Sequence, residues 1–136
     1  MVLFLDSNVI FDAALERLEF NEKAEQLLAL KDNKNYEIFI STLTIPNFHY
    51  VARKFYKEET LRKMISIIDS QCQTVPLTIE IIRAALKTEF KDFEDAVQYQ
   101  SALYAKADHI ITRNQKDFKK SEISVLTPTE FLSHLN

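Results

Sequence analysis

The sequence predicts an α/β protein, a three-layer α/β/α sandwich with a short central parallel sheet. Short apolar runs such as residues 2–5 lack the polar alternation of half-exposed strands, which is typical of parallel strands buried on both faces. Helical patterns separate these runs in the order strand, helices, strand, which favours parallel crossover connections. The 136 residues suffice for one hydrophobic core, and without a repeat or a linker we expect a single domain over residues 1–136.

Five segments have the composition of strands, and they cover residues 2–5, 37–41, 74–77, 109–112 and 123–126. The first is a continuous apolar run that ends at Asp6. The third should be a short edge strand, because Pro76 has no N–H to donate to a neighbouring strand.

Capping residues and apolar spacing predict the helices. The segment Asp6-Ser7-Asn8 offers capping side chains just before Val9, so a helix should begin there. Pro46 suits the first turn of a helix that we expect to run through Phe55. Further helices are expected over residues 22–30, 61–68, 79–86, 93–107 and 128–135.

Composition disfavours several classes of protein. Apolar residues make up 46% of the chain and charged residues 27%, the balance of a globular domain, and no apolar run approaches the roughly 20 residues of a membrane helix. The chain opens on Met1 without a basic leader, so we expect a cytoplasmic protein. Its single cysteine, Cys72, excludes an intrachain disulfide and disfavours a cysteine zinc site. The absence of glycine disfavours P-loop and dinucleotide-binding motifs.

Polar groups follow the predicted strands at the edge where open parallel sheets bind ligands. Asp6 ends the first strand, residues 112–114 end the fourth, and Asp117 lies three residues further on. Asp92 and Asp95 open the long helix and are three residues apart, so both can face one site. Converging carboxylates repel each other, and a hard divalent cation such as Mg²⁺ or Mn²⁺ relieves this repulsion.

Each of these residues also has a purely structural interpretation. Asp6 and Asp92 stand where helix N-caps are expected, with Asp95 as the N3 partner of Asp92. Asp117 can be an ordinary loop residue and Arg113 a solvated charge. The functional interpretation gains weight because all the clusters fall on one predicted edge. It also explains how a chain with a net charge of −3 can handle a nucleic acid, since a bound cation supplies the missing positive charge.

Four motifs, in order along the chain, resemble the PIN-domain family. Residues 5–10 (LDSNVI) are similar to the opening "LDTNVI" of PIN domains. Residues 92–96 (DFEDA) and 112–118 (TRNQKDF) resemble a pattern of the VapC-like subfamily found in toxin–antitoxin pairs, and residues 125–132 (VLTPTEFL) resemble its ending. The resemblance implies a PIN sandwich fold and Mg²⁺- or Mn²⁺-dependent endoribonuclease activity. It also implies an RNA substrate, an antitoxin partner and no membrane, and a homodimer is a further expectation.

The resemblance assigns roles to individual residues. Asp6, Asp95 and Asp117 would hold the metal, with Asn114 sharing the last position. Ser7 and Thr112 would support the site by hydrogen bonding, with Asp92 beside it and Arg113 holding a phosphate.

The sequence departs from the family pattern at one catalytic position. Many PIN nucleases carry a Glu at the start of the helix after the second strand, where this chain has Asn47, and Asn114 stands where some relatives have Asp. We therefore expect one metal rather than two. Two alternatives stay open: a weakened PIN domain that binds RNA or a protein without cutting, and an unrelated α/β domain whose acidic residues are only helix caps.

Aromatic residues crowd the helix after Asn47. Phe48, Ala52 and Phe55 follow the i, i+4, i+7 spacing of one face, so we expect that face to point inward. Tyr50 and Tyr56 can then line a groove for an antitoxin helix or contact a second copy. The basic residues of this region are expected to form a solvated face rather than to guide RNA: Arg53, Lys54, Lys57, Arg62 and Lys63.

Overall fold

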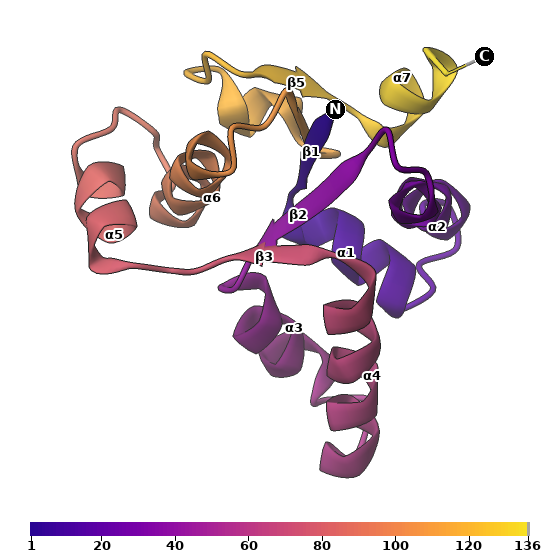
Figure 1. Cartoon of the computed structure of the whole chain (residues 1–136). Helices are drawn as coiled ribbons and strands as arrows, with labels where there is room; N and C mark the ends of the chain where they lie inside the picture. Colours follow the sequence, from indigo (N-terminus) through magenta and orange to yellow (C-terminus); the bar gives the residue numbers. More distant parts are fainter. Residues whose placement is uncertain (136) are drawn as a thin grey trace.

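A five-stranded, all-parallel sheet forms the centre of the computed structural model (Figure 1), which describes residues 1–135. Asn136, which the predicted domain includes, lies outside the described residues. The strand order is β3-β2-β1-β4-β5. The strands are β1 (Val2–Leu5), β2 (Glu37–Ser41), β3 (Gln73–Val75), β4 (His109–Ile111) and β5 (Ser124–Leu126). The predicted parallel sheet is confirmed, and β3 is an edge strand that ends just before Pro76.

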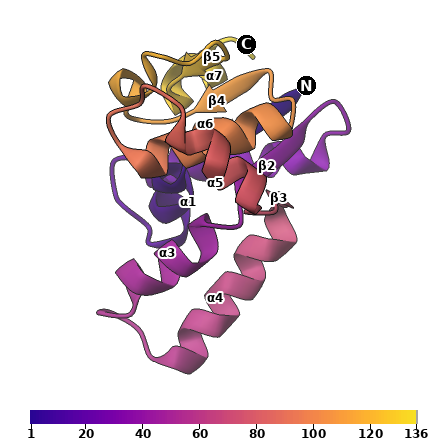
Figure 2. The same cartoon turned by 90° about the vertical axis from the view of Figure 1, so that its left-hand side faces the viewer.

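Seven α-helices cover both faces of the sheet (Figures 1 and 2). They are α1 (Ser7–Ala14), α2 (Asn21–Ala29), α3 (Thr44–Ala52), α4 (Glu58–Gln71), α5 (Ile79–Leu86), α6 (Phe93–Tyr104) and α7 (Pro128–Ser133). Two 3₁₀ turns lie at Leu30–Asp32 and Gln115–Phe118. Within residues 1–135, no helix combines the length and the apolar character needed to cross a membrane.

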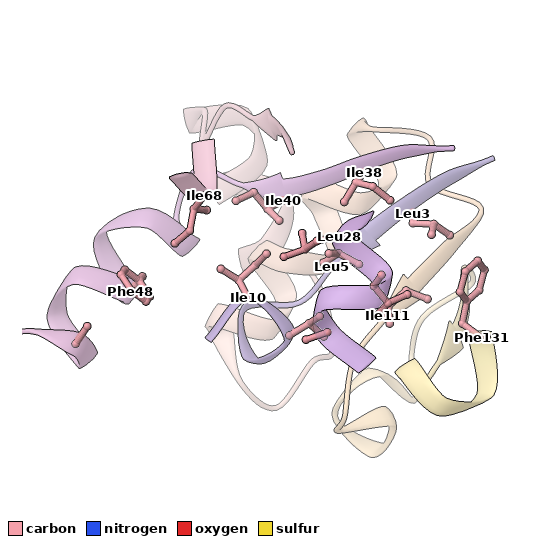
Figure 3. Close-up of a cluster of buried hydrophobic side chains, with 14 of the residues drawn as sticks. Leu3, Leu5, Ile10, Leu28, Ile38, Ile40, Phe48, Ile68, Ile111 and Phe131 are labelled. Carbon is pink, nitrogen blue, oxygen red and sulfur yellow. The ribbon is translucent and has the colours of Figure 1, made fainter. Parts of the chain in front are cut away.

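Alternation along the strands divides the core into two halves. Leu3 and Leu5 point to one side, where they pack with residues of α1, α2, α3, α4 and α7 (Figure 3). Phe4, between them in sequence, points to the other side and packs with residues of α5 and α6. Both halves are buried, as expected for parallel strands covered on two faces. The predicted three-layer sandwich is therefore confirmed.

The prediction that Phe55 points into the core is wrong. Phe48 and Ala52 are fully buried, but the Phe55 side chain is 72% exposed. The reason is that α3 ends at Ala52, so the helical spacing no longer applies three residues later. Residues 53–57 instead turn the chain toward α4.

A buried ion pair ties α1 to the loop that follows β4. The Asp12 carboxylate, whose side chain is 1% exposed, accepts hydrogen bonds from Nε of Arg113 at 2.6 Å and from Nη2 at 3.2 Å. The Arg113 guanidinium also lies over the Phe20 ring, with 4.0 Å from Cζ to the ring centroid. Arg17 is a second, more distant partner, with Nη1 at 3.5 Å from Asp12. These contacts fix the start of the loop that carries Asn114 and Asp117.

Replacing Arg113 by methionine should lower the free energy of unfolding by about 3 kcal/mol, because the Asp12 charge stays buried with only a distant partner. The matched control is Arg17→Met, which removes a half-exposed cation from the same carboxylate and should change the free energy by less than about 1 kcal/mol. Urea unfolding of both variants measures the difference. Equal effects would contradict the structural role of Arg113.

Candidate active site

The candidate site lies where the carboxyl ends of β1 and β4 meet. After β1 the chain enters α1 on one face of the sheet, whereas after β4 it runs to Phe118, which packs on the opposite face. In open α/β sheets such a divergence marks the switch point at which ligands usually bind, and we call this edge of the sheet the β1/β4 crevice. Asp6 directly follows β1, and Thr112 directly follows β4.

Hydrogen bonds hold the Asp6 carboxylate in place. Oδ2 accepts from the Thr112 hydroxyl at 2.7 Å and from the Asn8 side-chain amide at 3.3 Å, and Oδ1 accepts from the Ser7 N–H at 2.8 Å. The side chain is only 7% exposed. Burial raises the pKa of Asp6 to about 6, although the bonds from Thr112 and Ser7 favour the charged form. Thr112 therefore contacts Asp6 through its hydroxyl and Ser7 contacts it through its backbone N–H, while their role in supporting a metal site stays a prediction.

Asp95 faces the same edge from the first turn of α6. Asp92 is the N-cap of this helix and its side chain accepts the Asp95 N–H at 3.0 Å, so the predicted capping role of Asp92 is confirmed. Burial and, after it, the negative charges of Asp6, Asp92, Asp117 and Glu94 together raise the pKa of Asp95 to about 7. Asp6 in turn is affected by the charges of Glu94 and Asp117. The fold thus brings Asp6, Asp95 and the exposed Asp117 into one electrostatic cluster.

Glu94 belongs to this cluster, and the sequence analysis assigned it no role. Partial desolvation raises the pKa of Glu94, the Asp92 charge raises it further, and the polar side chain of the nearby Asn47 lowers it. Asn47 and Glu94 therefore meet across the crevice from α3 and α6. The sequence did show three acidic residues within positions 92–95. The contact between Asn47 and Glu94, however, joins residues 47 positions apart, and no sequence pattern predicts it.

Asn114 contributes through its backbone. Its N–H donates to the Thr112 hydroxyl oxygen at 3.1 Å, and its carbonyl accepts the Asp117 N–H at 3.0 Å. The loop from Thr112 to Asp117 is thereby folded back on the residue that binds Asp6. Whether the Asn114 side chain serves as a ligand stays a prediction.

A buried hydrogen-bonded triad of Ser7, Thr44 and Gln98 lies behind the cluster. The Ser7 and Thr44 hydroxyl oxygens are 2.9 Å apart, and Nε2 of Gln98 donates to Ser7 at 2.7 Å. Thr44 is fully buried and Gln98 is 1% exposed. Oε1 of Gln98 has no hydrogen-bond partner among the described residues.

Each member of the triad stands beside one group of the site. Ser7 follows Asp6, Thr44 is three residues before Asn47 in α3, and Gln98 is three residues after Asp95 in α6. The triad therefore sets the spacing of three elements that carry site residues. Thr44 and Gln98 were not singled out from the sequence.

The fold and the motifs agree with known proteins. The sequence model of the PIN domain matches residues 2–116. The chain belongs to the PIN domain family. It is 27% identical to Ribonuclease VapC1 of Aquifex aeolicus (strain VF5), an alignment that covers 98% of this chain and 95% of that protein.

Similar solved structures include a VapBC structure and a toxin–antitoxin complex. VapBC-1 from nontypeable Haemophilus influenzae has a TM-score of 0.70 at 19% identity and covers 95% of this chain and 99% of that chain. A toxin–antitoxin complex from Klebsiella pneumoniae has a TM-score of 0.66 at 25% identity and covers 94% of this chain and 98% of that chain.

Arg113, which the resemblance gave a role in holding a phosphate, pairs with a carboxylate in this PIN domain. Two of its guanidinium nitrogens donate to Asp12, and the side chain is about a quarter exposed. Its charge is therefore largely neutralised by a carboxylate outside the acidic cluster. A role in holding phosphate stays a prediction.

The donor set of the cluster suits a hard cation that keeps its waters. Within residues 1–135, neither Asp6, Asp95, Asp117 nor Glu94 forms an ion pair with lysine or arginine. No three acidic, histidine or cysteine groups in that range lie close enough together to enclose an ion. Mg²⁺ needs no such enclosure, since proteins commonly hold it through one or two carboxylates and several waters. Asp6 and Asp95 match that requirement.

The raised pKa values predict how stability depends on pH without metal. When the pKa of a carboxyl is higher in the folded than in the unfolded protein, the free energy of unfolding falls as the pH rises between the two pKa values. For Asp95 these are 3.8 in the unfolded protein and about 7 in the folded protein. Replacing Asp95 by asparagine removes this loss. The stabilisation by Asp95→Asn should therefore grow from about pH 4 to pH 7 and level off above it.

Urea unfolding in EDTA at several pH values measures this effect. Asp32→Asn is the matched control, because Asp32 is exposed and lies far from the cluster in the sequence. A pH-independent effect of Asp95→Asn, equal to that of the control, would mean that Asp95 experiences no electrostatic strain.

Proposed function

We propose that this PIN domain is a Mg²⁺- or Mn²⁺-dependent endoribonuclease and the toxin of a toxin–antitoxin pair. The observation that carries the proposal is the cluster of Asp6, Asp95, Asp117 and Glu94 in the β1/β4 crevice. The pKa values of Asp6, Glu94 and Asp95 are raised, and none of the four carboxylates pairs with a lysine or arginine in the described residues. Such uncompensated repulsion is typical of a site that binds a metal or performs chemistry. The similarity to Ribonuclease VapC1 supports the same activity.

The residues of the cluster would have different roles in holding the cation. Asp6, oriented by Thr112 and Ser7, and Asp95, at the start of α6, would bind the metal. When bound, the metal activates water for attack on a phosphodiester and offsets the charge that develops there. The more exposed Asp117 would hold the water shell of the metal at the rim of the crevice.

Glu94 supplies the charge that Asn47 lacks. The family pattern has a carboxylate at the position of Asn47, and here the Asn47 side chain lies close enough to Glu94, on the facing helix, to lower the pKa of Glu94. The crevice therefore keeps an acidic group at this place, provided by α6 rather than α3. This relocation favours activity over a weakened PIN domain.

The antitoxin would bind away from the crevice, in a groove between α1, α2 and α4. This groove has a volume of about 550 Å³ and an apolar floor that includes Ile10, Leu28 and Ile68. An apolar groove with a polar rim fits the apolar face of an amphipathic helix. One similar solved structure, from Klebsiella pneumoniae, is a toxin–antitoxin complex, which supports a partner of this kind. The homodimer stays a prediction.

A second candidate function is binding of RNA or a protein without cleavage. The observation that favours it is that, among the described residues, no three ligating groups enclose a point where an ion could sit. Asn47 and Asn114 also favour this function, because neither carries a charge that would hold a metal. Metal titration and cleavage assays separate the two functions.

The protein should cleave structured RNA in the presence of Mg²⁺ or Mn²⁺, and Asp6→Asn and Asp95→Asn should each reduce the rate at least about a hundredfold, because each removes a charged metal ligand. Asp32→Asn should cleave at the rate of the wild type. Gel analysis of end-labelled RNA measures the rates. Equal cleavage by all variants, or none by the wild type with either metal, would exclude the nuclease.

Glu94→Gln should weaken Mn²⁺ binding about tenfold, and adding Asn47→Asp to that variant should restore most of the affinity, because a carboxylate returns to the crevice from the other helix. Calorimetric titration measures both. Glu89→Gln is the control, since Glu89 is exposed and pairs only with Lys120 in the described part of the chain. If Glu94→Gln binds Mn²⁺ like the control, Glu94 has no part in the metal site.

A further inference from the structure

Three aromatic side chains are exposed together where α3 ends and the chain turns toward α4. Phe55 is 72% exposed, Tyr50 60% and Tyr56 39%. Large apolar rings are usually buried, so several exposed rings within seven residues indicate a binding surface. With the neighbouring cations they form what we call the aromatic-basic surface: Tyr50, Arg53, Lys54, Phe55, Tyr56 and Lys57.

The cations of this surface are available to a ligand. Within residues 1–135 its three basic side chains form no ion pair: Arg53, Lys54 and Lys57. The nearest acids in sequence are engaged elsewhere. Glu58 contacts His49 at 2.6 Å and Arg62 at 3.3 Å, and Glu59 contacts Lys63 at 3.7 Å. The surface is thus locally positive in a chain whose net charge is −3.

The arrangement of rings and cations suits nucleic acid bases. The Arg53 guanidinium already lies over the Tyr50 ring, with 4.1 Å from Cζ to the ring centroid. Aromatic rings and guanidinium planes are the groups on which unpaired RNA bases stack, while lysines contact the phosphates between them. An apolar protein helix would leave these three charges without partners, and the apolar groove between α1, α2 and α4 suits such a helix better.

The aromatic-basic surface and the acidic crevice lie at opposite ends of α3. Asn47, which contacts Glu94, is in the first turn of this helix, and Arg53 is its C-cap. At 1.5 Å per residue the two are separated by about 9 Å along the helix axis. Figure 2 shows α3 ending in a loop at the edge of the molecule. One RNA strand can therefore contact the surface and the crevice together.

We propose that the aromatic-basic surface binds a single-stranded segment of the RNA substrate next to the cleaved bond, with bases stacked on Tyr50, Phe55 and Tyr56. This inference rests on the proposed ribonuclease function and adds to it the surface that holds the RNA strand. The surface would select loops over duplexes, because bases in a duplex do not expose their faces.

Fluorescence anisotropy with a labelled, unstructured 12-nucleotide RNA tests the proposal, in EDTA so that binding is measured without cleavage. Phe55→Ala and Tyr56→Ala should each weaken binding about tenfold. Tyr104→Ala is the control, because Tyr104 is 64% exposed at the end of α6 and should leave affinity unchanged. Lys54→Gln should reduce the slope of log affinity against log salt by about 0.7. A duplex of the same length should bind more weakly than the single strand.

Cleavage by the wild type with Mg²⁺ is measured in parallel, so that the two failures are distinguishable. If the wild type cleaves RNA and the surface variants bind the single strand as the control does, the inference fails and the ribonuclease stands. If the wild type neither binds nor cleaves RNA, both fail. If the variants alter self-association in sedimentation but not RNA binding, the surface contacts a second copy and the inference is overturned.

Discussion

The structure of this PIN domain depends on holding carboxylates together against their mutual repulsion. Asp6, Glu94, Asp95 and Asp117 share one crevice. Burial is the largest cause of the raised pKa of Asp6 and Asp95, and it disfavours their charged forms in addition to the repulsion between the carboxylates. Neutral hydrogen-bond donors, rather than cations, stabilise the charged carboxylates against these effects. Thr112 binds Asp6 across the β1/β4 junction, so the carboxylate cannot turn away without breaking a 2.7 Å bond. A fold that tolerates such strain is suited to bind a cation whose charge relieves it.

The supporting contacts lie outside the crevice and act through rigid elements. The triad of Ser7, Thr44 and Gln98 joins α1, α3 and α6 in the buried interior, and each of these residues lies within one helical turn of a group at the edge. On the far side of Thr112, the ion pair between Asp12 and Arg113 anchors the loop that leads to Asp117. Buried hydrogen bonds and ion pairs have definite geometry, so they determine spacing as well as contributing to stability.

Helix α3 connects the chemical and recognition features of the molecule. Its first turn lies in the crevice, where Asn47 contacts Glu94, and its buried face packs through Phe48 and Ala52. Its last turn contains the exposed Tyr50, and the exposed Phe55 and Tyr56 follow it. The sequence analysis placed Phe55 in the core because helical spacing was continued past Ala52, and the end of a helix is where periodicity carries least information. The same misplacement left Phe55 out of the exposed group, of which the sequence analysis had named Tyr50 and Tyr56.

The sequence by itself determined the parallel sandwich, the edge strand near Pro76, the cap at Asp92 and the convergence of Asp6 and Asp95. These follow from local patterns: apolar runs that end at polar residues, capping side chains, and the rule that ligands bind at the carboxyl ends of parallel strands. Only the tertiary structure decided that Glu94 meets Asn47, that Gln98 joins Ser7 and Thr44, and that Arg113 pairs with Asp12. The residues that these contacts join are far apart in the sequence, from 37 positions for Ser7 and Thr44 to 101 for Arg113 and Asp12. Such pairings depend on how helices pack over the sheet, and packing leaves no periodic signal in the sequence.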